Sequence, residues 1–483
     1  MPWPALPIQG LPAWAHLNDV SFNNVKVTNT EGKGYGVVSD RAIEATEHPP
    51  PDAPILVTVP HDLVLNAAAV DEHAKEDKNF RLLLDAIGHR SARADVLLFL
   101  LVQTALASRP GHSSVGVSNP WTEYLQFLPE TVLVPTLWAE DERLLLRGTS
   151  LEAAVNAKIL ALDAEFGLVR EKSSDIICWN DLLWAAGGSV SFTDWIRLDA
   201  LYRSRCLELP RSGESMVPCI DMINHSAAPS AYYEENAKDE VVLLLRPGIS
   251  IPKGDEITIS YGDTKSAAEM LFSYGFIDPQ STADDLVLPL SPFPDDPLAK
   301  AKLVAFGQAP KIHVARSEDG TTIGWTSEFA YLMCVNEEDG LEFRILQQTD
   351  GARQLRVFWQ DEDVTDRTSD FEALIQAHPL SAVLRLRVVT VVEDCFQTQL
   401  ERLASSTPPG VTASSTQRED CFKTALALRE IERNILQGAL EALDGEKSSL
   451  LADKNVVAYL GLKEAAGSDL AGDEASNEAD DFS

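Results

Sequence analysis

The sequence has few cysteines, and their spacing suits neither a metal site nor a redox pair. The six cysteines lie far apart, and no Cys-x-x-Cys pair or Cys/His cluster is present. A reduced intracellular compartment, cytoplasm or nucleus, is the simplest expectation, and we expect no metal cofactor. The cysteines are Cys178, Cys206, Cys219, Cys334, Cys395 and Cys421.

Signals for secretion and for membrane insertion are also missing. The opening segment, MPWPALPIQG, lacks a basic stretch followed by an apolar run, so it does not resemble a secretory signal. The longest apolar run, from Val96 to Val102, is much shorter than the ~20 residues that a membrane helix needs. The sequence therefore predicts a protein without a membrane span.

Positive charge is scarce. The chain has 40 Lys and Arg residues against 74 Asp and Glu residues, which gives a formal net charge of -34. This balance repels phosphate backbones and disfavours direct nucleic-acid binding, whereas it favours a protein partner with a basic segment. Solubility is a simpler explanation of the same acidity. With 483 residues, the chain is long enough for two or three domains.

The order of strand-like and helical patterns predicts an α+β fold in which a helical segment splits a β region. Two β-branched stretches joined by a glycine turn occupy residues 25–38, and strand patterns return in MVPCIDMIN, EVVLLLRPG and EITISYG. Between them, at about residues 80–200, apolar side chains recur at helical spacing.

A second module follows the Pro-rich segment LSPFPDDP, and we place the boundary near Pro292. This module combines strand patterns at KIHVAR, LEFRILQ and QLRVFW with two long helical stretches. The expected domains are residues 18–291 and residues 292–463. We expect SSTPPGVTASSTQ to be a flexible connection between the last two helices, and the acidic tail 464–483 to be disordered.

Three short motifs carry most of the chemical information: VPCIDMINHS at residues 217–226, ITISYG at residues 257–262 and SYGF at residues 273–276. Together with EGKGYGV, NPWTEYLQFLP, YRSRC and ALALREIERNIL, they resemble the SET-domain methyltransferases. The similarity is to the subgroup that contains the Rubisco large-subunit methyltransferase, yeast ribosomal-protein lysine methyltransferases and an actin-histidine methyltransferase.

The resemblance implies a SET β-fold that a helical insertion splits, followed by a mainly helical C-terminal domain that helps to hold the substrate. It also implies S-adenosylmethionine as the methyl donor and a protein lysine as the acceptor. No cysteine-rich zinc segment of the histone-type branch follows Phe276. A non-histone substrate is therefore expected, with ribosomal proteins as one candidate class.

By this resemblance, Lys33, Gly34 and Tyr35 line one side of the cofactor pocket, largely through backbone groups, and glycine suits such a close approach. Asn224 and His225 match the pair that anchors the methionine and adenine portions of the cofactor. A tight hairpin and a buried polar pair are the structural alternatives. A dinucleotide-binding loop would need a helix after the glycines, whereas VVSDRAI has a strand pattern, and the HRD, DFG and GxSxG motifs are absent.

Tyr261 matches the catalytic tyrosine of the family, and Tyr274 matches a second tyrosine that contacts the target side chain. Arg205 and Asp221 match substrate-site positions, and Tyr233 is a further candidate. The rings could instead belong to the core, and the two charged residues to a structural salt bridge. Two other functions stay open: a histidine methyltransferase on the same scaffold, and an inactive SET-like module that only binds a basic protein.

Overall fold

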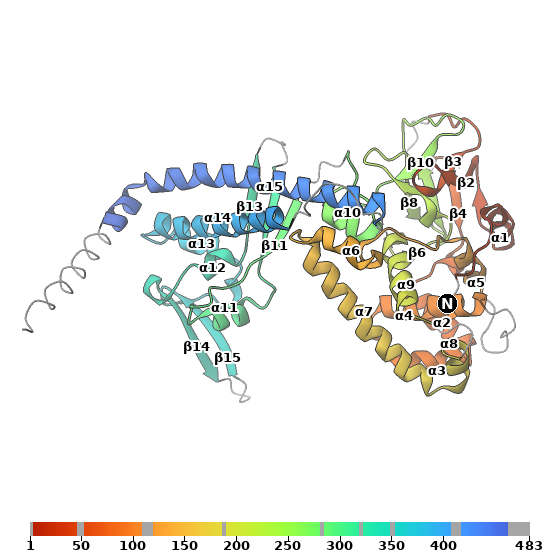
Figure 1. Ribbon diagram of the computed structural model, residues 1–483, viewed down its shortest axis with the longest axis horizontal. Helices are drawn as coiled ribbons and strands as arrows, with labels where there is room; N and C mark the ends of the chain where they lie inside the picture. Colours follow the sequence, from red (N-terminus) through yellow and green to blue (C-terminus); the bar gives the residue numbers. More distant parts are fainter. Residues whose placement is uncertain are drawn as a thin grey trace, which may run out of the picture. The chain divides into compact units, whose positions relative to one another are not determined.

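The computed structural model of the chain contains two compact units, each with its own hydrophobic core (Figure 1). The first unit consists of Met1–Leu144, Leu151–Thr282 and Ala413–Thr424, and the second of Leu145–Ser150, Ala283–Thr412 and Ala425–Ser483. The acidic tail and most of the connection SSTPPGVTASSTQ lie outside the described residues. The structure describes residues 3–45, 53–108, 119–185, 190–280, 285–317, 322–347, 353–406 and 417–461.

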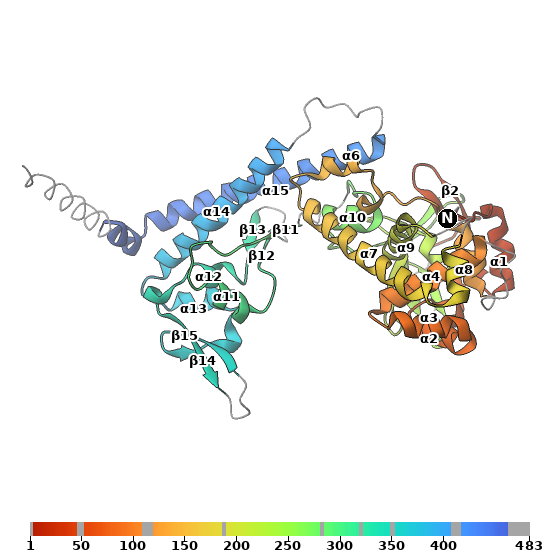
Figure 2. The same ribbon diagram turned by 60° about the horizontal axis from the view of Figure 1, so that its bottom comes forward.

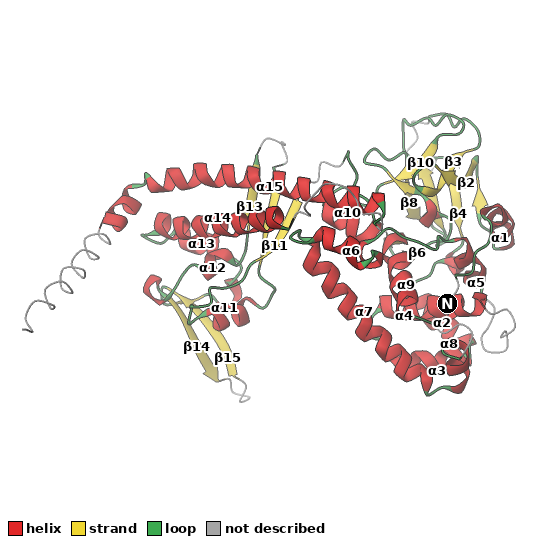
Figure 3. Cartoon of the chain, in the orientation of Figure 1, coloured by secondary structure: helices red, strands yellow, loops and turns green. Residues whose placement is uncertain are grey.

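Two four-stranded sheets form the main β part of the first unit (Figure 3). Their strand orders are β1-β4-β9-β8 and β2-β3-β10-β7. The strands of the first sheet are β1 (Ser21–Phe22), β4 (Ile55–Val59), β9 (Val241–Leu245) and β8 (Ala231–Glu235). Those of the second sheet are β2 (Val25–Thr30), β3 (Gly34–Ser39), β10 (Glu256–Ile259) and β7 (Asn224–His225).

The pairing of β7 with β10 brings two distant motifs together. Strand β10 alternates as its sequence predicts. Ile257 and Ile259 are buried in the core, while Glu256 and Thr258 face the other side. Strand β7 runs parallel to it, with Asn224 opposite Thr258 and His225 opposite Ile259. The motif that contains Asn224 and His225 therefore lies directly beside the motif that contains Tyr261.

Most helices of the first unit lie between β4 and the small β5–β6 hairpin in the sequence. The apolar run inside α4 is buried from Val96 to Ala105, which identifies it as a core helix. None of the helices in the described ranges is long and apolar enough to cross a membrane. The elements are α1 (Leu11–Leu17), α2 (Ala67–Glu76), α3 (Lys78–Ile87), α4 (Ala92–Ser108), α5 (Pro120–Tyr124), α6 (Glu140–Arg143), α7 (Leu151–Ser174), α8 (Ile177–Leu183), α9 (Phe192–Arg205), β5 (Cys206–Leu209), β6 (Gly213–Met216) and α10 (Ala267–Tyr274).

The second unit combines two three-stranded sheets with helices, which Figure 2 shows from a second direction. The strand patterns KIHVAR and LEFRILQ are confirmed as β12 (Lys311–Arg316) and β14 (Leu341–Gln347). The remaining strands are β11 (Asp285–Pro289), β13 (Ile323–Thr326), β15 (Arg353–Trp359) and β16 (Glu362–Asp363). The helices are α11 (Ala299–Phe306), α12 (Ala330–Met333), α13 (Phe371–Gln376), α14 (Ser381–Ser405) and the part of α15 (Glu419–Leu451) that begins at Ala425.

The motif ALALREIERNIL on α15 holds the short segment Leu145–Ser150 inside the second unit. Arg429 and Glu432 of this motif are both only 2% exposed. The Glu432 carboxylate accepts hydrogen bonds from the backbone N–H and the hydroxyl of Ser150, at 3.1 and 2.5 Å. The Arg429 guanidinium donates to two carbonyl oxygens of the segment, at 3.2 and 2.5 Å. Because buried charges need such partners, this motif has a structural role.

An ion pair within the first unit provides a test of the fold. Arg418 donates to both carboxylate oxygens of Glu142 on α6, at 2.8 and 2.6 Å, and this hydrogen bonding lowers the pKa of Glu142 from 4.5 to about 2. Because the folded-state pKa is the lower one, the stabilisation is present above about pH 4.5 and is lost as the pH falls towards 2. We predict that Glu142→Gln lowers the free energy of unfolding by roughly 1–3 kcal/mol at neutral pH, measured by urea unfolding.

The matched control is Glu140→Gln, because Glu140 is exposed on the same helix. We expect that variant to stay within about 0.5 kcal/mol of the parent protein. An equal loss of unfolding free energy in both variants would contradict the assignment. So would a difference in unfolding free energy between Glu142→Gln and the parent protein that does not shrink below about pH 4.5.

Candidate functional site

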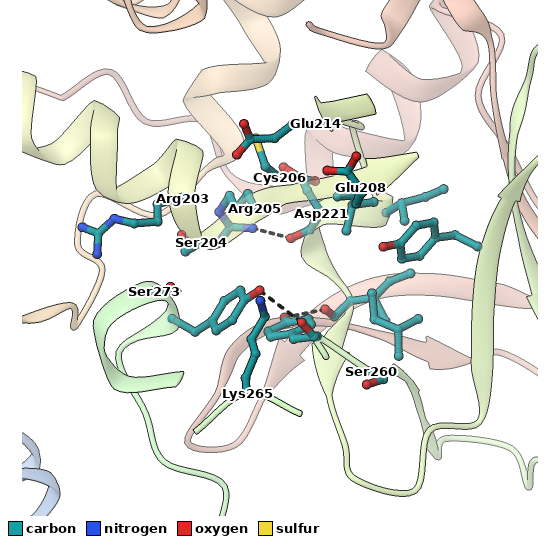
Figure 4. A pocket seen from close by; sticks show the side chains of 17 residues that line it. Arg203, Ser204, Arg205, Cys206, Glu208, Glu214, Asp221, Ser260, Lys265 and Ser273 are labelled. Carbon is teal, nitrogen blue, oxygen red and sulfur yellow. Dashed lines mark hydrogen bonds between the residues drawn. The ribbon is translucent and has the colours of Figure 1, made fainter. Parts of the chain in front are cut away.

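A cavity of about 290 Å³ in the first unit is lined by residues from several separate parts of the chain. Its lining comes from the end of α9 and the β5–β6 hairpin, the 3₁₀ turn Ile220–Met222, β8, the end of β10 and the end of α10 (Figure 4). The acceptor-site candidates from the sequence all line it: Arg205, Asp221, Tyr233, Tyr261 and Tyr274. The structure therefore brings together residues that are far apart in the sequence.

Arg203 links the end of α9, which carries Arg205, to the end of α10, which carries Tyr274. On α9, its guanidinium lies 3.3 Å from the carboxylate of Asp199, which is fully buried. It also donates to the carbonyl oxygen of Phe272 on α10 and lies over that ring, 4.4 Å from the centroid. These contacts fix the last turn of α10 against α9 and so position Tyr274.

Tyr261 lines the cavity next to Tyr274. Its hydroxyl donates to the carbonyl oxygen of Ile223 at 2.7 Å, and its ring centroid is 4.5 Å from that of Tyr274. The Tyr274 hydroxyl in turn points at the carbonyl oxygen of Tyr261, at 3.4 Å. Burial raises the pKa of the Tyr261 hydroxyl well above its usual value and that of Tyr274 to about 12. Both hydroxyls are therefore neutral at physiological pH and act as hydrogen-bonding groups.

Asp221 presents a carboxylate oxygen that has no partner in the described part of the chain. Tyr124 donates to one oxygen, Oδ1, and its hydroxyl accepts the backbone N–H of Cys219 at 2.7 Å. The other oxygen, Oδ2, is buried without a hydrogen bond among the described residues. Arg205 donates at 2.7 Å to the backbone carbonyl of Asp221, so this hydrogen bond goes to the main chain and not to the carboxylate. Burial raises the pKa of Asp221 to about 6.

The turn before Asp221 has an unusual backbone. The backbone of Cys219 has a φ of +70°, which residues other than glycine rarely adopt. The hydrogen bond from its N–H to the Tyr124 hydroxyl holds this conformation. Strained residues of this kind occur most often at functional sites, and this one directs the following carboxylate towards the cavity.

The residues assigned to the cofactor gather at the β2–β3 hairpin. The side-chain amide of Asn224 donates to the backbone carbonyl of Tyr35 at 3.3 Å and to the carboxylate of Glu256 at 2.7 Å. The other carboxylate oxygen of Glu256 lies 2.8 Å from the Lys33 ammonium. Gly36 makes this packing possible, because a Cβ there would lie 2.8 Å from both the amide and the carboxylate. Lys33, Tyr35 and Asn224 are thus brought together.

His225 faces the opposite side of the sheet and contacts Tyr261. Its Nδ1 accepts the backbone N–H of Tyr261 at 3.0 Å, and its Nε2 lies 3.2 Å from the carboxylate of Asp278. This pairing fits a neutral imidazole that carries its hydrogen on Nε2. The ring centroids of His225 and Tyr261 are 5.2 Å apart. The two residues of this short strand therefore point to opposite faces of the sheet, because strand side chains alternate. Asn224 contacts the hairpin and His225 contacts Tyr261.

Three residues of this arrangement did not emerge from the sequence as site candidates: Tyr124, Glu256 and Asp278. Tyr124 lies in the NPWTEYLQFLP motif, and Glu256 lies two residues from Thr258, the partner of Asn224. The alternation of β10 could have placed Glu256 beside Asn224. No local signal points to Asp278, because its contact with His225 spans 53 positions of sequence.

Comparisons with known proteins agree with this geometry. A family model described as SET domain matches residues 34–262. The chain contains a SET domain. A fission yeast (Schizosaccharomyces pombe) protein named SET domain-containing protein 8 is 27% identical over 412 residues, which is 84% of this chain and 89% of the relative.

Two other relatives match over smaller shares of their own length. The pea (Pisum sativum) ribulose-1,5 bisphosphate carboxylase/oxygenase large subunit N-methyltransferase is 29% identical over 39% of this chain and 40% of the relative. The chicken (Gallus gallus) actin-histidine N-methyltransferase is 22% identical over 72% of this chain and 57% of the relative. The SET-domain protein therefore spans less than two thirds of these two relatives.

Solved structures share the fold. A structure of the SET domain of LSMT, bound to lysine and AdoHcy, has a TM-score of 0.67 at 20% identity and covers 92% of both chains. A structure of Rubisco LSMT bound to AdoMet has a TM-score of 0.66 at 20% identity, covering 92% of this chain and 93% of that chain. The expected α+β architecture, a SET fold with a mainly helical C-terminal region, is confirmed.

The hydrogen bonds of Tyr124 generate a prediction. Tyr124→Phe removes one donor to the buried Asp221 carboxylate and the acceptor of the Cys219 N–H. We expect the free energy of unfolding to fall by roughly 2–4 kcal/mol, because two buried polar groups lose their partner. Denaturant unfolding at neutral pH measures this loss.

Tyr331→Phe is the matched control. Tyr331 is also buried, but its hydroxyl donates at 2.9 Å to Glu372, whose side chain is 53% exposed and can bind water instead. We expect a loss of at most about 1 kcal/mol there. Equal losses in the two variants would show that Tyr124 does not support the Asp221 turn in the way described.

Proposed function

We propose that this SET-domain protein transfers a methyl group from S-adenosylmethionine to the ε-amino group of a lysine in a non-histone protein. The position of Tyr261 is the observation that carries the proposal. Its backbone N–H is bonded to His225, next to the cofactor candidate Asn224, while its side chain lines the cavity with Tyr274 and Asp221. One tyrosine thus contacts both parts of the site. The similarity to proteins named as lysine methyltransferases supports the same conclusion.

The hairpin residues fit S-adenosylmethionine. Gly34, with φ of +81°, has nothing within 4 Å of where a Cβ would stand. Glycines of this kind let a ligand approach the main chain closely. When bound, the cofactor supplies a methyl group that is already activated on a sulfonium. The residues that we assign to it are Lys33, Gly34, Tyr35, Asn224 and His225.

Asp221 supports a cationic acceptor. A buried carboxylate oxygen without a partner is costly, and a lysine ammonium inside the cavity would satisfy it. The amine must then lose a proton, which from a reference pKa of ~10.4 costs about 4.6 kcal/mol at pH 7. Desolvation in the cavity reduces this cost. The raised pKa of Asp221, about 6, makes its carboxylate a stronger base than an ordinary aspartate.

Tyr261 orients the amine in this mechanism. Its hydroxyl hydrogen is donated to the Ile223 carbonyl oxygen, so the lone pairs of the hydroxyl oxygen remain to accept an N–H from the amine. The ring of Tyr274, tilted by 34° against that of Tyr261, provides a second wall for an aliphatic lysine stem. Holding the amine in line with the methyl group contributes up to ~7–11 kcal/mol to catalysis, because orientation is the main task in such a displacement.

The charge of the chain supports a substrate with a basic segment. Glu208 and Glu214 line the same cavity as Asp221, and the whole chain carries a formal charge of -34. Acidic surfaces attract basic partners over long distances. Ribosomal proteins are the candidate class that we place first. Identification of the methylated side chain by tandem mass spectrometry separates a lysine acceptor from a histidine acceptor.

The test of the proposed function is Tyr261→Phe. This change removes the hydroxyl but keeps the ring, so the fold and the ring contact with Tyr274 should remain. We predict a fall of about 100- to 1000-fold in the rate of methyl transfer, which is the usual effect of losing one positioned polar group. The measurement follows transfer of labelled methyl from S-adenosylmethionine to lysine in basic protein fractions.

Tyr232→Phe is the control, because Tyr232 lies on β8 outside the cavity lining. It should retain near-normal transfer. Near-normal transfer by Tyr261→Phe would show that the hydroxyl does not orient the acceptor. No transfer by the parent protein to any basic fraction, although it binds the cofactor, would count against a lysine methyltransferase.

A further inference from the structure

Lys265 brings an ammonium group to the cavity beside Tyr261. It lines this cavity together with Tyr261, Tyr274 and Asp221, and Figure 4 shows its side chain extending into the space. The residue is half-buried. Among the residues that the structure describes, none forms a hydrogen bond or an ion pair with the Lys265 ammonium. An uncommitted positive charge therefore faces the space proposed for the acceptor lysine.

The aliphatic stem of Lys265 lies against the backbone that follows Tyr261. A Cβ added at Gly262 would stand 2.9 Å from Cε and 3.1 Å from Cγ of Lys265, so the stem passes directly over this glycine. Gly262 is the residue after Tyr261 in the ITISYG motif. The stem is thus packed next to the tyrosine that orients the acceptor in the proposed mechanism.

Fold stability does not account for the charge at this position. Lys265 directly precedes Ser266, the N-cap of α10, and the N-terminal end of a helix carries a partial positive charge that disfavours cations. The carboxylates nearest in sequence have other partners, because Asp263 accepts a hydrogen bond from Ser260 and Glu269 accepts one from Ser266. The fold therefore gains little from an ammonium here.

The charges around the cavity show what Lys265 changes. Three carboxylates line it, against two guanidinium groups and Lys265. Both guanidinium groups have protein partners, since Arg203 lies 3.3 Å from the Asp199 carboxylate and Arg205 donates to a main-chain carbonyl oxygen. Without Lys265, the carboxylates would outnumber the cations and would hold a bound lysine in its ammonium form. The three carboxylates are those of Glu208, Glu214 and Asp221.

The remaining titratable groups of the lining add no charge. Burial raises the pKa of the hydroxyls of Tyr233, Tyr261 and Tyr274 above the usual value, and it also raises the pKa of the Cys206 thiol. These four groups are neutral at physiological pH. The balance of charge in the cavity is therefore set by the carboxylates, the two arginines and Lys265.

We propose that the Lys265 ammonium repels the ammonium form of a bound acceptor lysine and so promotes the loss of the proton that must precede methyl transfer. The inference rests on the proposed function and deepens it, because it adds a residue that controls the protonation of the acceptor. Like charges that share a site disfavour the charged form of a titrating group. A cavity of about 290 Å³ leaves little space for screening water between two amines.

The proton leaves the acceptor nitrogen for Oδ2 of Asp221, which has no hydrogen bond among the described residues, and passes from there to solvent. The freed lone pair forms the N–C bond to the methyl group while the S–C bond breaks, and the electron pair of that bond stays on sulfur. S-adenosylhomocysteine and a methylated amine are the products. Lys265 neither gives nor takes a proton in these steps.

The experiment compares the pH dependence of kcat in Lys265→Met and in the parent protein, because kcat reports protonation within the bound complex. Methionine keeps a long stem over Gly262 but removes the charge. We expect kcat at neutral pH to fall about tenfold, since the acceptor pKa in the complex rises by roughly one unit. The difference should disappear above about pH 10.5, where lysine loses its proton unaided. KM should not rise, because the bound ammonium is no longer repelled.

Two further variants separate charge from structure. Lys265→Arg keeps the positive charge and should retain a near-normal kcat profile. Lys238→Met removes an exposed lysine between β8 and β9, outside the cavity lining, and should change neither kcat nor KM. The measurement follows transfer of labelled methyl from S-adenosylmethionine to the basic protein fraction that the parent protein methylates fastest.

The outcomes distinguish this inference from the proposed function. If the parent protein transfers methyl groups and Lys265→Met is equally fast at neutral pH, or is slowed equally at every pH, the inference is wrong and the proposed function stands. Lys265→Arg or Lys238→Met as slow as Lys265→Met at neutral pH also overturns the inference alone. If the folded parent protein transfers no methyl group to any basic fraction, the proposed function fails and the inference fails with it.

Discussion

The site depends on one short backbone pairing, the parallel contact between β7 and β10. It is only two residues long on the β7 side, yet it sets Asn224 opposite Thr258 and His225 opposite Ile259. Because strand side chains alternate, this register sends the asparagine to the outer face with the β2–β3 hairpin and the histidine to the side of Tyr261. A shift by one residue would exchange the two faces and separate the residues proposed for the cofactor from the tyrosine.

Beside this pairing, the hydrogen bonds of Tyr261 and Asp221 leave polar atoms of both side chains free to bind an acceptor amine. The Tyr261 hydroxyl donates its hydrogen to the Ile223 carbonyl oxygen, so the lone pairs of the hydroxyl oxygen remain available. Tyr124 donates to only one carboxylate oxygen of Asp221. Burial keeps the tyrosine hydroxyls neutral and raises the affinity of Asp221 for a proton. The cavity thus combines a neutral acceptor of hydrogen bonds with a carboxylate that can meet a cation. This combination suits a lysine that must be bound as an ammonium and used as an amine.

The sequence predicted the parts of the fold that local patterns determine. The alternation in EITISYG placed Ile257 and Ile259 in the core, and KIHVAR became strand β12 with the bounds of the motif. The resemblance to SET domains supplied the acceptor residues, and the structure brings all of them to one cavity. The partners of these residues could not be predicted in this way. The Tyr124 bond to Asp221 spans 97 positions and the Lys33 bond to Glu256 spans 223, so only the folded sheet register reveals them.

A crystal structure of the chain with S-adenosylhomocysteine tests the central claim most directly. The account predicts that the amino-acid end lies at Asn224 and the β2–β3 hairpin, and that the sulfur faces the cavity beside Tyr261. A ligand bound elsewhere, or one whose sulfur is turned away from Tyr261, would contradict the claim that the β7–β10 pairing joins the cofactor to the acceptor cavity.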